Sequence, residues 1–151
     1  MEKNVVKNIL ADMDLRQNLI KLKGSMTATD TLEGPIVEKL CDCLTHEDPK
    51  VRKNAALLLG YTKNPLMASV LLDSYKNEEK DFVKDAYLKG MGHYDCKPYI
   101  KELQEIQNEL MNSEVVDSKH IKAQLKVLNP MIRSYSYHKK KSIRLLHKEV
   151  D

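Results

Sequence analysis

Apolar residues recur every three or four positions along most of the chain, in segments separated by short polar breaks. The clearest segment lies at residues 47–65, where an acidic turn, an apolar run, a glycine and a proline follow one another. Asp48 and Pro49 predict the start of a helix there, and Gly60 predicts its end. Similar units lie on both sides of this stretch, so the pattern predicts a tandem repeat of helices.

Two features recur in phase and define the repeat. The first is a proline followed by two apolar residues, which suits the first turn of a helix, and it occurs at Pro35, Pro65, Pro98 and Pro130. The second is an apolar residue followed by a basic one, which opens the other helix of each pair, at Leu15-Arg16, Val51-Arg52, Val83-Lys84 and Ile121-Lys122. These columns predict repeats at residues 1–24, 35–60, 65–92 and 98–129, with a break at Asn129-Pro130 and a capping helix at 130–151.

Some breaks between the predicted helices are less regular. Residues 5–24 hold either one helix or two, with Asp12 or Asp14 able to cap the second. Residues 24–34 mix small and hydroxyl side chains with glycine at each end, which predicts a loop. Glycines end three of the second helices and predict positive φ there, at Gly24, Gly60 and Gly92.

Composition supports an all-α fold. The 151 residues include five glycines, five prolines, one phenylalanine and no tryptophan, whereas helix-forming leucine, lysine and glutamate are plentiful. No apolar run approaches the roughly 20 residues of a membrane span, and the first residues lack a signal peptide pattern, so we expect a soluble cytoplasmic protein. The predicted fold is an α-α superhelix, a solenoid of antiparallel helix pairs, in a single domain over residues 1–151.

Residues 48–60 resemble the second-helix signature of HEAT repeats, especially the shorter HEAT-like repeats named after phycobilisome lyases. The resemblance is carried by Asp48-Pro49-Lys50-Val51-Arg52-Lys53-Asn54-Ala55-Ala56-Leu57-Leu58-Leu59-Gly60 and, less closely, by residues 81–92. It implies an α-solenoid of about four repeats, with first helices on the convex side and second helices lining the concave side. Tandem repeats of this kind usually bind partners rather than transform them.

Charge is divided between the two helices of each pair. The four second-helix segments have a net charge of +8, three first-helix segments have −9, and residues 130–151 have +4. If second helices line the concave side, as the resemblance implies, a chain of net charge +3 has a basic groove and an acidic back. Such a groove could receive phosphates or an acidic peptide.

The basic residues have two competing interpretations. In the structural one, a ladder joins them to carboxylates such as Asp48 and Asp81 in the turns, and its basic members are Arg16, Arg52, Lys84 and Lys122. HEAT-like proteins often use an arginine at the position of Arg52 in this way, which favours the ladder for that residue. The residues freer to contact a ligand are Lys53, Lys89 and Lys126, together with the tail residues Lys139, Lys140, Lys141 and Arg144, which follow two tyrosines.

Patterns typical of catalysis or metal binding are missing from the sequence. Three cysteines without a second close pair predict reduced thiols rather than a zinc site, and the five histidines show no close pairing. His46-Glu47 is similar to one His-Glu pair of HEAT-like deoxyhypusine hydroxylase, but that family uses several pairs within helices. There is no glycine-rich phosphate loop or nucleophile motif, so we expect no enzymatic activity, cofactor or metal.

The sequence therefore favours a non-enzymatic scaffold that recognises a protein partner on its concave face. The alternative is an RNA-binding module at the N-terminal side of a larger methyltransferase-like protein. Residues 81–90 are similar to HEAT-like segments that precede methyltransferase domains in some bacterial proteins.

Overall fold

The computed structural model describes residues 3–114 and 118–150, and it describes side chains at residues 4–114 and 118–135. Within these ranges the chain forms eight α-helices and two short 3-10 helices, and no strand. The prediction of an all-α fold is confirmed. The chain divides into two compact units, Met1–Asp95 and Cys96–Asp151, which are considered separately below.

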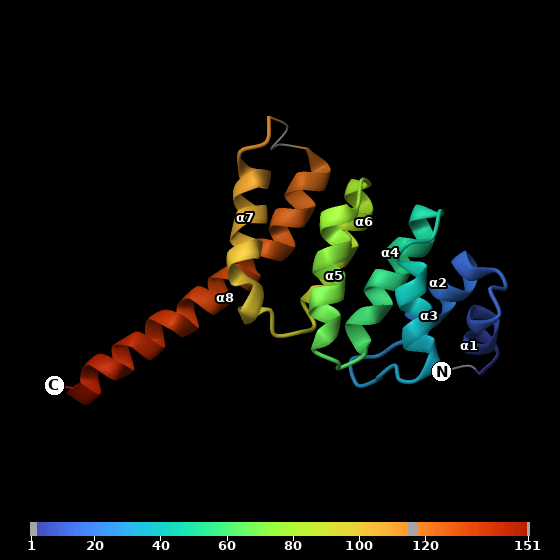
Figure 1. Cartoon of the computed structure of the whole chain (residues 1–151), viewed down its shortest axis with the longest axis horizontal. Coiled ribbons are helices and arrows are strands. Elements are labelled where there is room, and N and C mark those ends of the chain that lie inside the picture. The colour runs from blue at the N-terminus through green and yellow to red at the C-terminus, as the bar shows by residue number, and fades with distance from the viewer. Residues whose placement is uncertain (1–2, 115–117, 151) are drawn as a thin grey trace. The chain divides into compact units, whose positions relative to one another are not determined.

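The first unit is a stack of three helix pairs (Figure 1). Its elements are α1 (Lys3–Leu10), α2 (Leu15–Ser25), α3 (Pro35–Cys43), α4 (Pro49–Leu58), the 3-10 helix η1 (Leu59–Tyr61), α5 (Leu66–Asn77) and α6 (Asp81–Met91). Helix α1 packs against α2, α3 against α4, and α5 against α6, while α4 also contacts both α2 and α6. The second helices thus form one layer and the first helices another, which is the arrangement of an α-solenoid.

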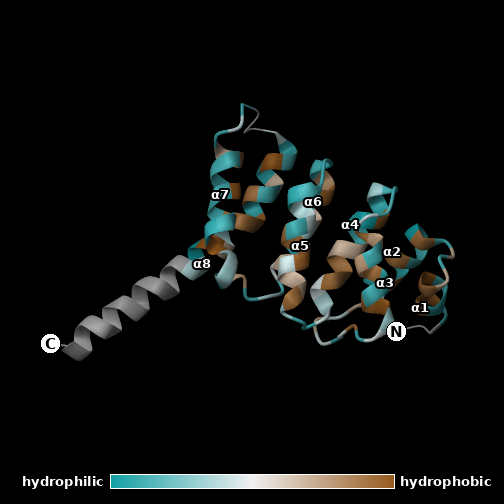
Figure 2. Cartoon of the chain, viewed as in Figure 1, coloured by the Kyte–Doolittle hydropathy of each residue, from teal (hydrophilic) through white to brown (hydrophobic). Residues whose placement is uncertain are grey.

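Hydrophobic residues recur along each helix of this unit (Figure 2), and many of their side chains are buried between the helices. Helix α4 lies between α2 and α6, and its residues Ala55, Ala56 and Leu58 are fully buried. Small side chains let the α4 and α6 backbones approach closely. A Cβ added at Gly90 of α6 would lie only 2.6 Å from the carbonyl oxygen of Ala56, so the absence of a side chain there is a packing requirement.

Helix starts in the first unit largely follow the sequence pattern. Pro35 and Pro49 occupy the first turns of α3 and α4, and Asp48 caps α4 by accepting a hydrogen bond from the backbone N–H of Lys50 at 2.9 Å. The segment at residues 5–24 contains two helices rather than one. Asp14 precedes the second helix with positive φ, but its side chain makes no capping hydrogen bond.

The helices predicted to end at Gly24, Gly60 and Gly92 do end within two residues of these positions, but the prediction of positive φ at the three glycines was wrong. Gly24 lies inside α2, Gly92 has a φ of −61°, and Gly34 is the one described glycine with positive φ. Gly60 belongs to η1, where the chain tightens into a 3-10 turn instead of entering the left-handed region. Its lack of a side chain instead leaves room for His93, whose Cδ2 atom would lie 2.5 Å from an added Cβ.

The second unit contains the 3-10 helix η2 (Lys97–Tyr99), α7 (Ile100–Met111) and α8 (Lys119–Val150), with α7 packed against α8. The predicted break at Asn129-Pro130 was wrong, because α8 continues through Pro130. Contacts made by residues after Pro130 stabilise the continuation of α8. Ile132 is buried, and the Tyr135 hydroxyl accepts a hydrogen bond from the backbone N–H of Cys96 at 2.6 Å. None of the helices in the described residues is both long and apolar enough to cross a membrane.

Candidate functional site

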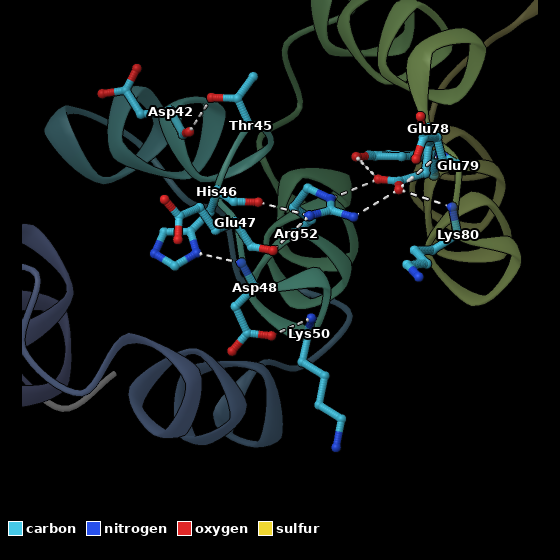
Figure 3. A network of polar contacts seen from close by, with 11 residues as sticks. Asp42, Thr45, His46, Glu47, Asp48, Lys50, Arg52, Glu78, Glu79 and Lys80 are labelled. Atoms are coloured by element: carbon cyan, nitrogen blue, oxygen red, sulfur yellow. Dashed lines mark hydrogen bonds and ion pairs between the residues drawn. The ribbon is translucent and has the colours of Figure 1, made fainter.

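Arg52, near the start of α4, joins two turns of the first unit (Figure 3). Its Nε and Nη2 atoms donate to the two carboxylate oxygens of Glu78 at 2.8 and 2.9 Å. Its Nη1 atom donates to the carbonyl oxygens of His46 and Glu47 at 2.8 and 3.2 Å. One guanidinium therefore connects the turn before α4 to the turn before α6. We call Arg52, Glu78 and Tyr87 the turn clamp.

Glu78 is the buried centre of the turn clamp, with a side chain only 4% exposed. It also accepts hydrogen bonds from the Tyr87 hydroxyl at 3.2 Å and from the backbone N–H groups of Glu79 and Lys80, both at 3.1 Å. Burial alone would raise the pKa of Glu78, but the bonds from Arg52 and the Lys80 N–H outweigh it and lower that pKa. The carboxylate is therefore ionised at neutral pH.

Tyr87 completes the turn clamp from α6. Burial, and then the neighbouring Glu78 carboxylate, hold the pKa of Tyr87 far above its ordinary range. The hydroxyl consequently stays protonated and donates its proton to Glu78. Tyr87 thus satisfies one lone pair of a carboxylate that has little contact with water.

A cavity of about 370 Å³ lies beside the turn clamp, and residues on its wall include Leu44, His46, Arg52, Ser74, Glu78 and Tyr87. The two ionised members of the clamp on this wall already pair with each other. A ligand that bound to these two charged groups would have to break a bidentate ion pair, which is among the stronger polar contacts in proteins. The contacts of Arg52 and Glu78 therefore serve to join the turns of neighbouring repeats.

Arg16 and Asp48 make a second link between neighbouring repeats. Arg16 Nε lies 3.1 Å from Asp48 Oδ2, while Asp48 Oδ1 accepts the Lys50 N–H that caps α4. The hydrogen bond from Lys50 and then the charge of Arg16 lower the pKa of Asp48. This pair is more exposed than the turn clamp, with side chains 49% and 29% accessible, so it stabilises less.

The remaining residues of the predicted ladder are Lys84, Asp81 and Lys122, and their positions are as follows. Lys84 on α6 places its Nζ atom 5.5 Å from the centre of the Tyr75 ring on α5, within the range of a cation-π contact. Asp81 is exposed at the start of α6, and Lys122 is exposed on α8 of the second unit. The partner of Arg52 is Glu78, which lies in the same kind of turn as the predicted carboxylates.

The structure brings together two of the predicted ligand-contacting lysines and adds a third. Lys23 on α2 donates to Asn54 Oδ1 on α4 at 3.2 Å. Burial, followed by the positive charges of Lys53 on α4 and Lys89 on α6, lowers the pKa of Lys23, so both of these lysines lie within electrostatic range of it. Lys89 also pairs with Asp85, whose Oδ2 atom lies 2.9 Å from its Nζ.

These lysines belong to a partly exposed surface that the second helices share. On each helix the apolar and basic members are three, four or seven positions apart, which places them on one side of that helix. We define this second-helix face by Ile20, Lys23, Lys53, Leu57, Phe82 and Lys89. It crosses α2, α4 and α6, which pack in that order.

Other predicted ligand residues lie elsewhere. Lys126 is exposed on α8 in the second unit. The side chains of Lys139, Lys140, Lys141 and Arg144 lie outside the described part of the chain, so the prediction for the basic tail stays a prediction.

Sequence reasoning did not identify Glu78, Tyr87 or Lys23. Glu78 is followed by a second glutamate, and no local pattern separates the buried carboxylate from the exposed one. Lys23 could have been predicted to lie on the basic side of its helix, because it follows Arg16 by seven positions and therefore shares its helix face.

The described residues offer little for covalent or metal chemistry. Burial raises the pKa of the Cys41 and Cys43 thiols, which keeps them protonated and weakly nucleophilic. Within the part of the chain that is described, no group of three or more histidine, cysteine, aspartate or glutamate side chains is placed to hold a metal ion.

Comparison with known proteins places this architecture in a family. No curated protein and no solved structure matches the chain significantly. The family model of HEAT repeats matches residues 5–92, which comprise most of α1 and the helices through α6 and amount to more than half of the chain. The finer resemblance to the phycobilisome-lyase type stays a prediction. Proteins of this family are generally protein-interaction scaffolds. Given the extent of the match and the stacked helix pairs that it covers, the chain belongs to the HEAT-repeat family.

Proposed function

We propose that this chain is a non-enzymatic scaffold that binds a protein partner along the second-helix face. The observation that carries the proposal is the row of Lys23, Lys53 and Lys89, which lie on α2, α4 and α6, the packed second helices of three successive repeats. Bringing like charges together costs free energy in the unbound protein. An anionic partner would relieve that repulsion, so the row favours binding of negative charge.

The stacked repeats suit such a partner. Each helix pair buries apolar residues against its neighbours and leaves a regular outer surface, so a partner lying across α2, α4 and α6 contacts several repeats at once. The first-helix segments of the chain are net acidic. A negatively charged partner is therefore drawn toward the second-helix face and away from the opposite layer.

A carboxylate on the same side favours protein over RNA. Asp85 pairs with Lys89, so a negative charge stands beside the lysine row. Every residue of an RNA strand carries a phosphate, and the strand would have to place one near Asp85. A peptide can place an uncharged residue at that point and still present carboxylates to Lys23 and Lys53.

Binding of two labelled probes at low and high salt tests the proposal. The probes are an acidic peptide of about 12 residues, in which uncharged residues separate the glutamates, and a single-stranded RNA of about 12 nucleotides, and binding is measured by fluorescence anisotropy. We expect the peptide to bind. We also expect the double variant K53Q/K89Q to weaken it about fivefold to thirtyfold, because each exposed ion pair contributes on the order of 0.5–1 kcal/mol.

A matched variant controls for the loss of charge alone. K7Q/K101Q removes two exposed lysines outside the second-helix face and should leave peptide binding within about twofold. Equal weakening by both double variants would mean that overall charge, rather than this face, holds the peptide. Tight, steeply salt-dependent binding of RNA without peptide binding would reject the protein-scaffold proposal in favour of the nucleic-acid alternative.

A further inference from the structure

The second-helix face is amphipathic rather than uniformly basic. On α2, Ile20 is 48% exposed and lies three residues before Lys23. On α4, Leu57 is partly exposed four residues after Lys53. Each of these helices thus presents one apolar side chain beside one lysine.

Helix α6 repeats the arrangement with the only phenylalanine of the chain. Phe82, Asp85 and Lys89 follow one another at spacings of three and four residues, so they share one side of α6. Phe82 and Asp85 are both partly exposed. Asp85 has one further feature, since its Oδ1 atom is buried without a hydrogen bond among the described residues.

The apolar positions are separated by the packing distance between helices. Axes of packed helices lie about 8–10 Å apart. A peptide in the polyproline II conformation has three residues per turn and rises about 3.1 Å per residue, so every third side chain lies on the same side, about 9 Å from the one before it. A segment of this kind crossing α2, α4 and α6 would therefore bring every third side chain to an apolar site, and the residues between them would reach the lysines.

We infer that the second-helix face binds an acidic protein segment in an extended, polyproline-II-like conformation, with apolar side chains at about every third position contacting Ile20, Leu57 and Phe82. This inference rests on the proposed function, and it adds the composition of the partner segment and the spacing of its apolar residues. Its carboxylates would pair with Lys23, Lys53 and Lys89, which complement them in charge. Exposed aromatic and aliphatic side chains ringed by polar groups are the usual composition of a binding site.

Two peptides of equal length and similar charge test the inference on the full chain. One carries leucine at every third position among glutamates, and the other has serine at those positions. We expect the leucine peptide to bind about tenfold or more tightly, since three apolar side chains would leave water. Equal affinities for the two peptides would overturn the inference while leaving the proposed scaffold function intact.

Variants of the apolar residues locate the contact. Phe82→Ala and Ile20→Ser should each weaken the leucine peptide about threefold to tenfold and leave the serine peptide unchanged. Leu66→Ala is the matched control, because Leu66 is 68% exposed on α5 and lies outside the face. An effect of Leu66→Ala as large as that of Phe82→Ala would overturn the inference. If K53Q/K89Q leaves binding of both peptides unchanged, the proposed function fails with it.

Discussion

Arg52 and Glu78 form a two-point ion pair across 26 residues of sequence, with Nε–Oε1 and Nη2–Oε2 distances of 2.8 and 2.9 Å. The planar guanidinium matches the carboxylate in geometry, so both contacts form at once. Because Arg52 also holds two carbonyl groups of the preceding turn, the pair sets the position of one repeat relative to the next. The second helices carry the lysine row, so this pair also supports the surface proposed to bind a partner.

Removing the carboxylate of the turn clamp should destabilise the first unit strongly. Glu78→Ala leaves Arg52, whose side chain is 16% exposed, without its counter-charge, and we expect the free energy of unfolding to fall by about 2–4 kcal/mol. Urea unfolding followed by circular dichroism measures this change. Arg16→Ala breaks the exposed pair with Asp48 and should cost only about 0–1 kcal/mol. Similar losses in the two variants would show that burial does not distinguish the pairs.

The turn clamp also predicts a pH dependence. The folded-state pKa of Glu78 lies below its ordinary value of 4.5, so its stabilising contribution is complete above that value. The contribution is lost as the pH falls through the lower folded-state pKa. We therefore expect the difference in unfolding free energy between the wild type and Glu78→Gln to be largest near neutral pH and to shrink between about pH 5 and pH 2. A difference that stays constant over this range would contradict an ionised clamp.

Two glycines with close neighbours should respond differently to substitution. Gly90→Ala would place a methyl group 2.6 Å from the carbonyl oxygen of Ala56, and the α4 and α6 backbones would have to separate. We expect this to cost about 1–3 kcal/mol in unfolding free energy. At Gly60→Ala the three atoms nearest the new methyl group all belong to the ring of His93, an exposed side chain that can rotate away, so the cost should stay within about 0.5 kcal/mol. Thermal and urea unfolding of the two variants compare these costs directly, and an equal loss would argue against the backbone contact.

Local signals predicted the helix pairs, because each depends on residues close in sequence. Proline in a first helical turn and an aspartate cap act within a few residues, so Pro35, Asp48 and Pro49 mark helix starts that the structure confirms. The sequence also predicted the all-α fold and the HEAT-repeat family. The regular spacing of prolines, caps and apolar residues along the chain was enough for these two predictions.

Contacts between repeats were harder to predict. Glu78 becomes the partner of Arg52 only once α4 and α6 have packed, and an unpaired glutamate in a turn looks the same in sequence. Gly60 was predicted to supply positive φ, but its actual constraint is the ring of His93 from the next repeat. In both cases tertiary packing decided the role of a residue whose local pattern suggested something else.

Pro130 is the position where packing overrides a local signal most directly, and it gives the last prediction. A proline inside a helix removes one backbone hydrogen bond and crowds the preceding turn, at a cost of up to about 3 kcal/mol. Helix α8 nevertheless continues through it, since Ile132 is buried and Tyr135 bonds to the backbone of Cys96. Pro130→Ala should therefore stabilise the second unit by about 1–3 kcal/mol, seen as slower hydrogen exchange in residues 119–135. Pro98→Ala is the control, because Pro98 lies in the first turn of η2, where its missing N–H costs little, and it should give no gain. Faster exchange in Pro130→Ala would show instead that a bend at the proline is needed to seat Ile132 and Tyr135.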